Sequence, residues 1–535
     1  MAESSQTSRR RMPWALAFIL GVALTLRLAG IHWGLPNQQH YFSYHPDEIF
    51  LLLPSFGFAQ GDLNPHFFNY GTLYLYLVGL PAVALGLVPD PASFPAGLRS
   101  LYLEGRIITA LLGAATVLLL YLALRRESPW LARISAAFLA ICPLHVVTSH
   151  YATVDVPATF FLTLAFLFAL RGAEGADSRA ALPVGLALGL AAATKYNAGL
   201  FLLPALVAPL FSGQKLKLGW WLALPVGALL GFLIGNPYVG SDEFLKGFLF
   251  ELRHAQAGGT LAFVNTGSGW IYHLTRGLPV ALGYPLLAAT AAGVVAAVAR
   301  RSAPARLSLL WIVFYLSVIG FGRERFVRYL VPLTPFLCVL AAWGIMSLTR
   351  RARRPRLQAA AALLGCVVVL LTALYAGGRI MPLIGFDARE FAWLQARSDV
   401  LGARPEARIG LVHSPWYYHP PVSPYNAGAF SRQMFDAWNA EQGDRVVVTG
   451  WDGAHLAAAR PSLFFLSDLE TADPVRLRDP ATLGFMSELE RRYSAQRTFG
   501  NAPAPFSWLA PSRKWAPPDW LYDSPRITLY YDWRE

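Results

Sequence analysis

The sequence has few charged residues. Only 14% of its 535 residues are Asp, Glu, Lys or Arg, whereas 55% are hydrophobic. A soluble chain would carry about 25% charged residues. The mean hydropathy is +0.40, and several apolar runs reach the ~20 residues that a helix needs to cross about 30 Å of hydrocarbon. The composition excludes an ordinary soluble domain and predicts a mainly α-helical, polytopic membrane protein.

Cysteine is equally scarce, since only Cys142, Cys338 and Cys366 are present. Each lies in an apolar run, where cysteine acts as a small apolar residue. This pattern excludes a disulfide framework and a metal–thiolate site. Internal repeats, which are common in membrane transporters, are also lacking.

The net charge of +13 raises the question of a nucleic-acid partner. The basic residues lie between apolar runs, which is the pattern of cytoplasmic loops in membrane proteins, so we expect no nucleic acid. Although the first run resembles a signal peptide, no small-residue cleavage site follows it, and we interpret it as a retained helix. The basic clusters are at 9–11, 125–133, 171–179, 215–217, 300–306 and 350–356.

The apolar runs predict a bundle of about eleven spans, with the N-terminus inside and the C-terminus outside. A further run, 71–88, is assigned to the membrane surface, because a span there would put the His45 and Asp155 regions on opposite faces. Its tyrosines and Pro81 suit an interfacial helix better than a span. The predicted spans are 12–31, 103–124, 131–149, 156–171, 181–194, 197–212, 217–236, 279–299, 307–322, 329–349 and 357–376.

The composition divides the chain into two domains. Residues 1–376 form the predicted transmembrane domain, in which 32–102 is a long first outer loop and 237–278 a second one. Residues 377–535 are mixed in polarity, rich in proline and numerous enough for a core of their own. We expect a small α/β domain outside the membrane, with helices at 387–397 and 481–493 and strands at 408–413, 445–449, 462–465 and 526–531.

The most informative motif is His-Pro-Asp-Glu at 45–48, just after the first span. A partly desolvated carboxylate such as Asp47 can take the proton of an acceptor hydroxyl, as a general base does in a transferase. The alternative is a helix cap, because Asp47 and Glu48 would also stabilise the first turn of a helix.

Two further polar groups fall on the same predicted face. Asp155 follows His150 between two spans, where it could orient the acceptor, share a divalent metal with Asp47, or cap the next helix. Lys195 interrupts an apolar stretch, and a charge in a membrane helix is costly. It is either a phosphate contact or a lysine that extends to the interface.

The loop at 322–329 departs from the charge bias of the other loops. It carries Arg323, Arg325 and Arg328, yet the predicted topology places it outside. Arginine binds phosphate through two parallel hydrogen bonds. The loop therefore predicts a phosphate site, unless the topology is wrong. Carboxylates and cations on one face suit sugar transfer from a lipid-phosphate donor.

These residues resemble the family 39 glycosyltransferases, which include protein O-mannosyltransferases and lipid A aminoarabinose transferases. The resemblance covers roughly residues 12–349. The segments that carry it are 44–48, 68–74, 149–155, 185–196 and 328–332, together with Arg106 and the helix that follows it.

The resemblance implies a GT-C fold and inverting transfer from a polyprenyl-phosphate-linked sugar at the outer face of the cell membrane. It makes Asp47 the base, with Glu48 as its acidic neighbour and Asp155 as the second outer acid. Any metal would lie between Asp47 and Asp155. The implied substrate-binding residues are His45, Tyr70, Arg106, His150, Lys195, Arg325, Arg328 and Tyr329.

The sequence also departs from the family. Asn69-Tyr70 stands where a lysine-proline pair is frequent, the 237–278 loop is too short for a β-trefoil insertion, and 377–535 matches no known motif. An oligosaccharyltransferase stays open as an alternative, although Gly-Trp-Asp-Gly at 450–453 only loosely resembles the signature of that family and suits a turn. A transporter or flippase is a further alternative. The acceptor, whether protein, lipid or polysaccharide, stays open.

Overall fold

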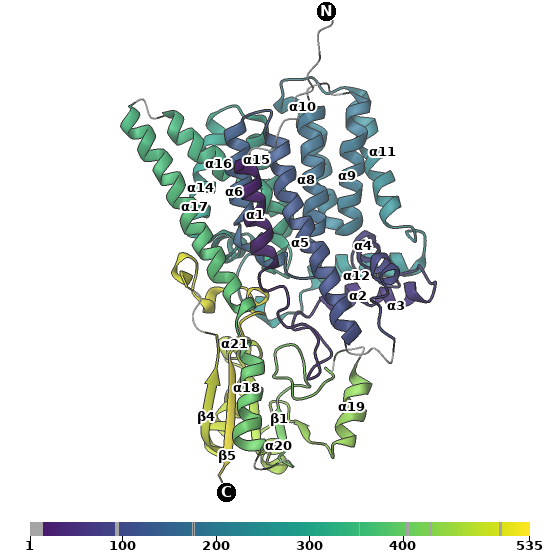
Figure 1. Cartoon of the computed structure of the whole chain (residues 1–535), viewed down its shortest axis with the longest axis vertical. Helices are drawn as coiled ribbons and strands as arrows, with labels where there is room; N and C mark the ends of the chain where they lie inside the picture. Colours follow the sequence, from purple (N-terminus) through teal and green to yellow (C-terminus); the bar gives the residue numbers. More distant parts are fainter. Residues whose placement is uncertain are drawn as a thin grey trace, which may run out of the picture.

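The computed structural model places a small β-sheet at one end of a helical bundle (Figure 1). We call this end of the bundle the sheet end. The cluster Arg9–Arg11 and the start of the predicted first span lie outside the described residues. The structure describes residues 14–90, 96–173, 175, 177–351, 354–402, 404, 406–426, 428, 431–501 and 505–534.

Each of the eleven runs predicted as spans contains helix among its described residues, but the run 131–149 is broken at 141–142 into two short helices. By length and composition, six helical segments of the described chain are able to cross a membrane, namely Gly97–Leu124, Asp155–Gly172, Leu218–Gly235, Gly269–Ala299, Val327–Arg351 and Pro355–Leu401. The number and orientation of the spans stay predictions. The bundle helices are α1 (Trp14–Leu28), α5 (Ala96–Leu124), α6 (Pro129–Ala140), α7 (Pro143–Thr148), α8 (Asp155–Gly172), α9 (Ser178–Thr194), η1 (Tyr196–Phe201), α10 (Leu202–Phe211), α11 (Leu218–Gly235), α13 (Gly269–Tyr272), η3 (His273–Gly277), α14 (Leu278–Ala299), α15 (Ala303–Ile319), η4 (Val327–Leu333), α16 (Thr334–Arg351) and α17 (Pro355–Ile384).

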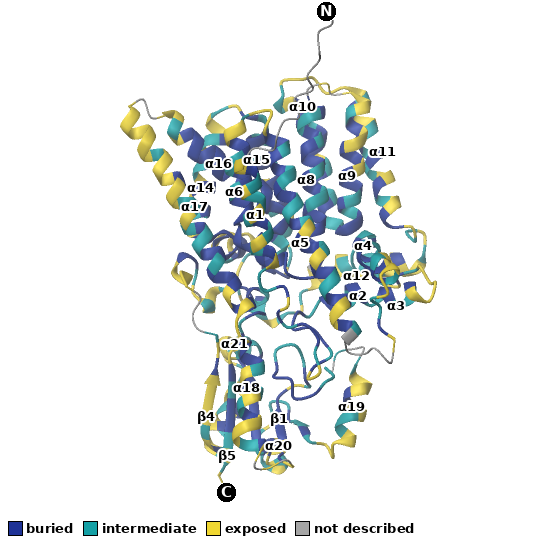
Figure 2. Cartoon of the chain, viewed as in Figure 1, coloured by how far each residue is buried: buried dark blue, intermediate teal, exposed yellow. Residues whose placement is uncertain are grey.

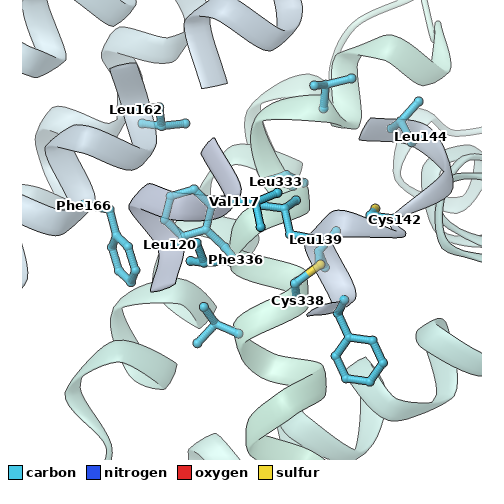
Figure 3. Packing of buried hydrophobic residues seen from close by; sticks show 14 of the residues in the cluster. Val117, Leu120, Leu139, Cys142, Leu144, Leu162, Phe166, Leu333, Phe336 and Cys338 are labelled. Carbon is cyan, nitrogen blue, oxygen red and sulfur yellow. The ribbon is translucent and has the colours of Figure 1, made fainter. Parts of the chain in front are cut away.

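The centre of the bundle is α16, which is buried along nearly its whole length, whereas much of α17 is exposed (Figure 2). Phe336 of α16 packs against Phe166 of α8, with ring centroids 5.0 Å apart. Cys142 and Cys338 lie in the same apolar cluster (Figure 3), and all three cysteines are free. Shape complementarity around α16 therefore organises the bundle.

Helices α9 and α11 approach closely through glycine. A Cβ atom on Gly185 or Gly189 would lie only 2.1 Å from a backbone oxygen of α11, and one on Gly231 only 2.3 Å from an oxygen of α9. Small residues four apart let two membrane helices pack backbone to backbone. This pair fixes the end of α9, where Lys195 follows.

The long loop predicted at 32–102 contains three short helices, α2 (Glu48–Leu52), α3 (Pro54–Ala59) and α4 (Leu73–Ala84). At about 1.5 Å per residue, α4 extends ~18 Å, too short for ~30 Å of hydrocarbon. Figure 1 shows α2, α3, α4 and α12 (Asp242–Ala257) grouped toward the sheet end. This arrangement supports the surface assignment of 71–88.

The C-terminal segment forms a five-stranded sheet of order β2-β1-β3-β5-β4, parallel between β1 and its neighbours and antiparallel at β5. The four predicted strands are present. β4 was not predicted, because its alternate residues are polar and exposed. The strands are β1 (Ile409–Leu411), β2 (Val446–Val448), β3 (Leu463–Ser467), β4 (Tyr493–Phe499) and β5 (Ile527–Trp533). The remaining helices are η2 (Leu261–Phe263), α18 (Ala388–Ala396), η5 (Arg397–Leu401), α19 (Arg432–Glu441), α20 (Gly453–Ala459), α21 (Asp468–Arg476), α22 (Pro480–Arg492), η6 (Ser507–Leu509), η7 (Arg513–Trp515) and η8 (Pro518–Trp520).

Buried polar contacts join this segment to the bundle. Arg379 of α17 pairs with Asp523 at 2.9 Å. The Trp33 indole N–H donates to Asp387 at 2.9 Å, and Asp387 also pairs with Arg389 at 2.6 Å. Such bonds hold the C-terminal segment over the loop that carries the 45–48 motif.

Candidate active site

Glu48 is completely buried in a polar network. Arg106 Nε and Nη2 donate to its two carboxylate oxygens, each at 2.7 Å. The Ser43 hydroxyl and the Ala152 N–H also donate to Glu48. Arg106 additionally donates to the Trp33 carbonyl at 2.6 Å. Because two-bonded, charge-assisted pairs are strong and directional, this network fixes α2, α5 and the loop before α8 relative to one another.

Asp47, one residue earlier, has a different environment. Its side chain makes no capping hydrogen bond to α2, the alternative that the sequence left open. Arg328 Nη2 lies 3.2 Å from Asp47 Oδ2, and the two side chains are 14% and 27% exposed. Burial raises the pKa of Asp47, but the charges of Arg328, His45 and Lys195 together outweigh burial and hold this pKa below its ordinary value. Asp47 is therefore an accessible, ionised carboxylate.

Arg328 retains unused hydrogen-bonding capacity. Its guanidinium lies over the Phe326 ring, 4.2 Å from the centroid. Within the described residues, its Nη1 is buried without a hydrogen-bond partner. Buried donors of native proteins normally have partners. The free Nη1 beside Asp47 therefore suits an anionic group of a substrate.

A second ion pair joins the start of α8 to the end of α9. Asp155, in the first turn of α8, accepts a hydrogen bond from Lys195 Nζ at 2.6 Å, and both side chains are buried. Lys195 Nζ also lies 5.2 Å from the Tyr329 ring centroid and 6.0 Å from that of Tyr70. Lys195 is thus held among a carboxylate and two ring faces, rather than extended to solvent.

Side chains of the 323–328 loop bind to the second outer loop. Glu324 accepts hydrogen bonds from the backbone of Gly259 and Thr260. Arg325 donates to the Thr266 hydroxyl and lies over the Tyr272 ring. Arg325 therefore faces the 260–272 segment, whereas Arg328 faces Asp47.

The two predicted histidines differ in position. His45 is buried beside the site, with its ring 4.3 Å from that of Tyr151, and its Nδ1 accepts a hydrogen bond from the Asp47 N–H at 3.3 Å. His150 lies 2.9 Å from the carbonyls of both Val146 and Ala29, and its contacts join α1 to α7. The structure therefore places His45, but not His150, next to Asp47.

Sequence reasoning missed the contribution of the C-terminal segment. Asp519 of η8 accepts hydrogen bonds from the backbone N–H groups of Val327 and Arg328, each at 3.0 Å. The Tyr522 ring packs edge-on to His45 at 5.6 Å. No local pattern marked these residues, because Asp519 follows two prolines in a segment of loop composition.

Glu251 of α12 is a further acid that the sequence did not single out. Burial raises the pKa of Glu251. Lys195 and Arg328 act to lower this pKa, and Asp47 acts to raise it. Its place in a strongly amphipathic helix of the second loop is the only signal that the sequence offered.

The proposed metal position does not fit this arrangement. Asp47 pairs with Arg328, and Asp155 pairs with Lys195. Each carboxylate already faces a cation, whereas a divalent ion needs a concentrated set of oxygen ligands. Among the described residues, no group of three or more His, Cys, Asp or Glu side chains is arranged to hold a metal. We derive no step through a metal.

The fold is that of the GT-C membrane glycosyltransferases. The structure of the Archaeoglobus fulgidus oligosaccharyltransferase matches with a TM-score of 0.53 at 13% identity, over 95% of this chain and 76% of the other. The AglB structure from the same organism, in complex with an inhibitory peptide and a dolichol-phosphate, matches with a TM-score of 0.52 at 12% identity, over 94% and 75%. ArnT from Cupriavidus metallidurans, bound to undecaprenyl phosphate, gives 0.49 at 15% identity, over 96% and 97%.

Two family models match the sequence. Residues 101–238 match dolichyl-phosphate-mannose-protein mannosyltransferase, and residues 267–423 match the Alg9-like mannosyltransferase family. No curated protein matches significantly. Each model covers less than a third of the chain, and both describe mannosyltransferases. Together with the GT-C fold, they confirm the predicted resemblance to membrane glycosyltransferases.

Proposed function

We propose that this glycosyltransferase moves a sugar, with inversion, from a polyprenyl-phosphate donor to an acceptor hydroxyl at the outer membrane face. The observation that supports this most is the Asp47–Arg328 pair, in which an accessible carboxylate meets a guanidinium with an unpartnered Nη1. The base and the phosphate-binding cation are then the two partners of a single ion pair. The nearby Asp155–Lys195 pair supplies a second cation.

The reaction breaks the bond between the sugar C1 and a phosphate oxygen. The acceptor oxygen attacks C1 from the opposite side, its proton passes to Asp47, and the bonding electrons leave with the phosphate. Negative charge grows on the phosphate during this step, so Arg328 and Lys195 stabilise the transition state more than the bound donor.

Arg328 also controls the basicity of Asp47. In the free enzyme Arg328 holds the pKa of Asp47 low, which makes the carboxylate a weak base. A donor phosphate that engages Arg328 offsets its charge, and the pKa of Asp47 rises. Proton transfer is most effective when the base pKa approaches the working pH. Donor binding therefore activates the base.

The other predicted residues take supporting roles in this proposal. Glu48 and Arg106 saturate one another, so they position the segment that carries Asp47. Asp155 orients Lys195, and the Tyr70 and Tyr329 rings flank its ammonium group.

An oligosaccharyltransferase is a second candidate, favoured by the fold match to the archaeal enzyme. The Gly-Trp-Asp-Gly segment gives it no support, because Asp452 caps α20 through the Ala454 and His455 N–H groups. Trp451 packs against Phe485, at 5.7 Å between centroids. This segment is a structural turn.

The test is Asp47→Asn, assayed in membranes with a panel of labelled polyprenyl-phosphate sugars. Because general-base catalysis contributes roughly 10²–10⁴-fold, we expect turnover to fall by at least about 100-fold. Asp62→Asn is the matched control, since Asp62 is an exposed acid of the same loop, paired with His66 and hydrogen-bonded by the Asn64 N–H. Near-normal turnover by Asp47→Asn would exclude the assigned role. A labelled product on asparagine would favour the second candidate.

A further inference from the structure

A cleft lined by cationic and aromatic side chains lies between the C-terminal segment and the start of α14. Its volume is about 680 Å³, and its walls come from η3, α21, η7 and η8. Five cationic side chains and two aromatic rings line it, namely Arg276, Arg476, Arg513, Lys514, Arg526, Tyr272 and Trp515.

Two of these cations are already neutralised. Arg513 pairs with Asp468 at 2.7 Å, and Arg476 pairs with Asp473 at 3.2 Å and also donates to backbone carbonyls of the second loop. These pairs build the wall of the cleft. Arg276, Lys514 and Arg526 are the lining cations that form no ion pair among the described residues.

Arg276 and Lys514 have no hydrogen-bond or ion-pair partner in the part of the chain that the structure describes. The Arg276 guanidinium lies 4.7 Å from the Trp515 ring centroid and 5.3 Å from that of Tyr272. Lys514 Nζ lies 5.9 Å from the same Trp515 ring. The rings hold the cations by cation–π attraction while their N–H donors stay available.

The cleft lies at the level where the bundle helices end. Arg276 belongs to η3, directly before α14, and η6 packs against both α14 and α17. Two tryptophans are exposed here, Trp508 by 69% and Trp515 by 47%. Exposed tryptophans near span ends mark the headgroup region of a bilayer.

We propose that this cleft binds the phosphate group of an anionic membrane lipid. Arginine donates two parallel hydrogen bonds to phosphate, and lysine adds a point charge. The exposed Trp515 ring offers an apolar surface for the start of the acyl chains. A lipid, rather than free phosphate, is favoured because the cationic and aromatic groups occur together at headgroup level.

This site is separate from the one at Asp47, although η8 adjoins both. Pro518 lines the cleft, while its neighbour Asp519 accepts the Arg328 and Val327 N–H groups. A bound lipid would therefore lie behind the element that positions Arg328. The proposal extends beyond the proposed sugar transfer and does not depend on it.

The test is titration of the purified full-length protein in detergent with short-chain phosphatidic acid. We expect Arg276→Gln and Lys514→Gln each to weaken binding about fivefold, as the loss of one cation near an anionic lipid predicts. Arg497→Gln, an exposed arginine of β4, removes the same charge elsewhere and should leave the affinity unchanged. Thermal melting confirms that each variant is folded.

Two comparisons identify the ligand. Short-chain phosphatidylcholine should bind more weakly than phosphatidic acid, and inorganic phosphate more weakly still. Equal binding by inorganic phosphate would overturn the lipid assignment, and equal affinity of Arg276→Gln and the unaltered protein would overturn the site. Asp47→Asn should bind phosphatidic acid normally, so this result stands or falls separately from the proposed function.

Discussion

Glu48 and Asp47 are adjacent acids with opposite surroundings. Glu48 is fully buried, and donors from three other residues occupy its oxygens. Asp47 is 27% exposed and has one cationic partner, 3.2 Å away. The difference shows that a pair of acids in sequence need not act as a pair in chemistry. The saturated carboxylate fixes the geometry, and the accessible one is able to react.

The largest expected effect is the loss of stability when the buried Glu48 loses its partner Arg106. Arg106→Gln leaves the Glu48 charge buried and without its ion-pair partner, which typically costs about 3–5 kcal/mol. We expect a large loss of thermal stability, measured in detergent by melting of the purified protein. Arg99→Gln, an exposed position of the same helix, is the control. Equal melting of both variants would contradict the role given to the Glu48 network.

An intermediate effect is expected from Arg328→Gln, which removes the partner of the accessible acid, Asp47. At low donor concentration, kcat/KM reports the free enzyme. Because the lowered pKa of Asp47 keeps this carboxylate of the free enzyme ionised as the pH falls, kcat/KM of the unaltered enzyme should be lost only below the ordinary range of an aspartate. Removal of Arg328 takes away the largest of the influences that lower the pKa of Asp47. The acid limb of kcat/KM against pH should therefore move to higher pH, with a weaker apparent affinity for the donor.

The control for this profile is Arg323→Gln, since Arg323 is an exposed arginine of the same loop that donates to the Ala257 carbonyl. Its acid limb should match that of the unaltered enzyme. A limb that stays in place in Arg328→Gln would show that Asp47 is not the group that titrates.

The smallest effect should be that of Asp47→Asn on stability. Partly exposed ion pairs contribute about 0–1 kcal/mol, so its melting temperature should differ little from normal, in contrast to its turnover. Glu48→Gln, melted in parallel, should be clearly less stable. Similar destabilisation by both substitutions would remove the distinction between the two acids.

The length of the apolar runs was enough to predict the helices of the bundle. A run of about 20 apolar residues in a membrane must satisfy its own backbone hydrogen bonds, which favours a helix. The same reasoning failed at β4, whose polar residues face solvent. It also missed α19, α20 and α21, which are short and contain few buried residues.

The candidate site was predictable only in part. Asp47, Asp155, Lys195 and Arg328 stood out because charge is rare near apolar runs, and the structure brings them together in two ion pairs. Their partners were not predictable. Which cation meets which acid depends on helix packing, and Asp519 reaches Arg328 from 191 positions away in the chain.

The close packing of α9 against α11 has a consequence for the length of α9. Lys195 directly follows this helix, and Gly189 fixes the helix against the α11 backbone six positions earlier. Each residue of an α-helix turns the chain by about 100°. One residue inserted between Gly189 and Lys195 would therefore point the ammonium group away from Asp155, without any change in composition. The spacing from glycine to lysine is thus a constraint that a homologous sequence must satisfy to keep this ion pair.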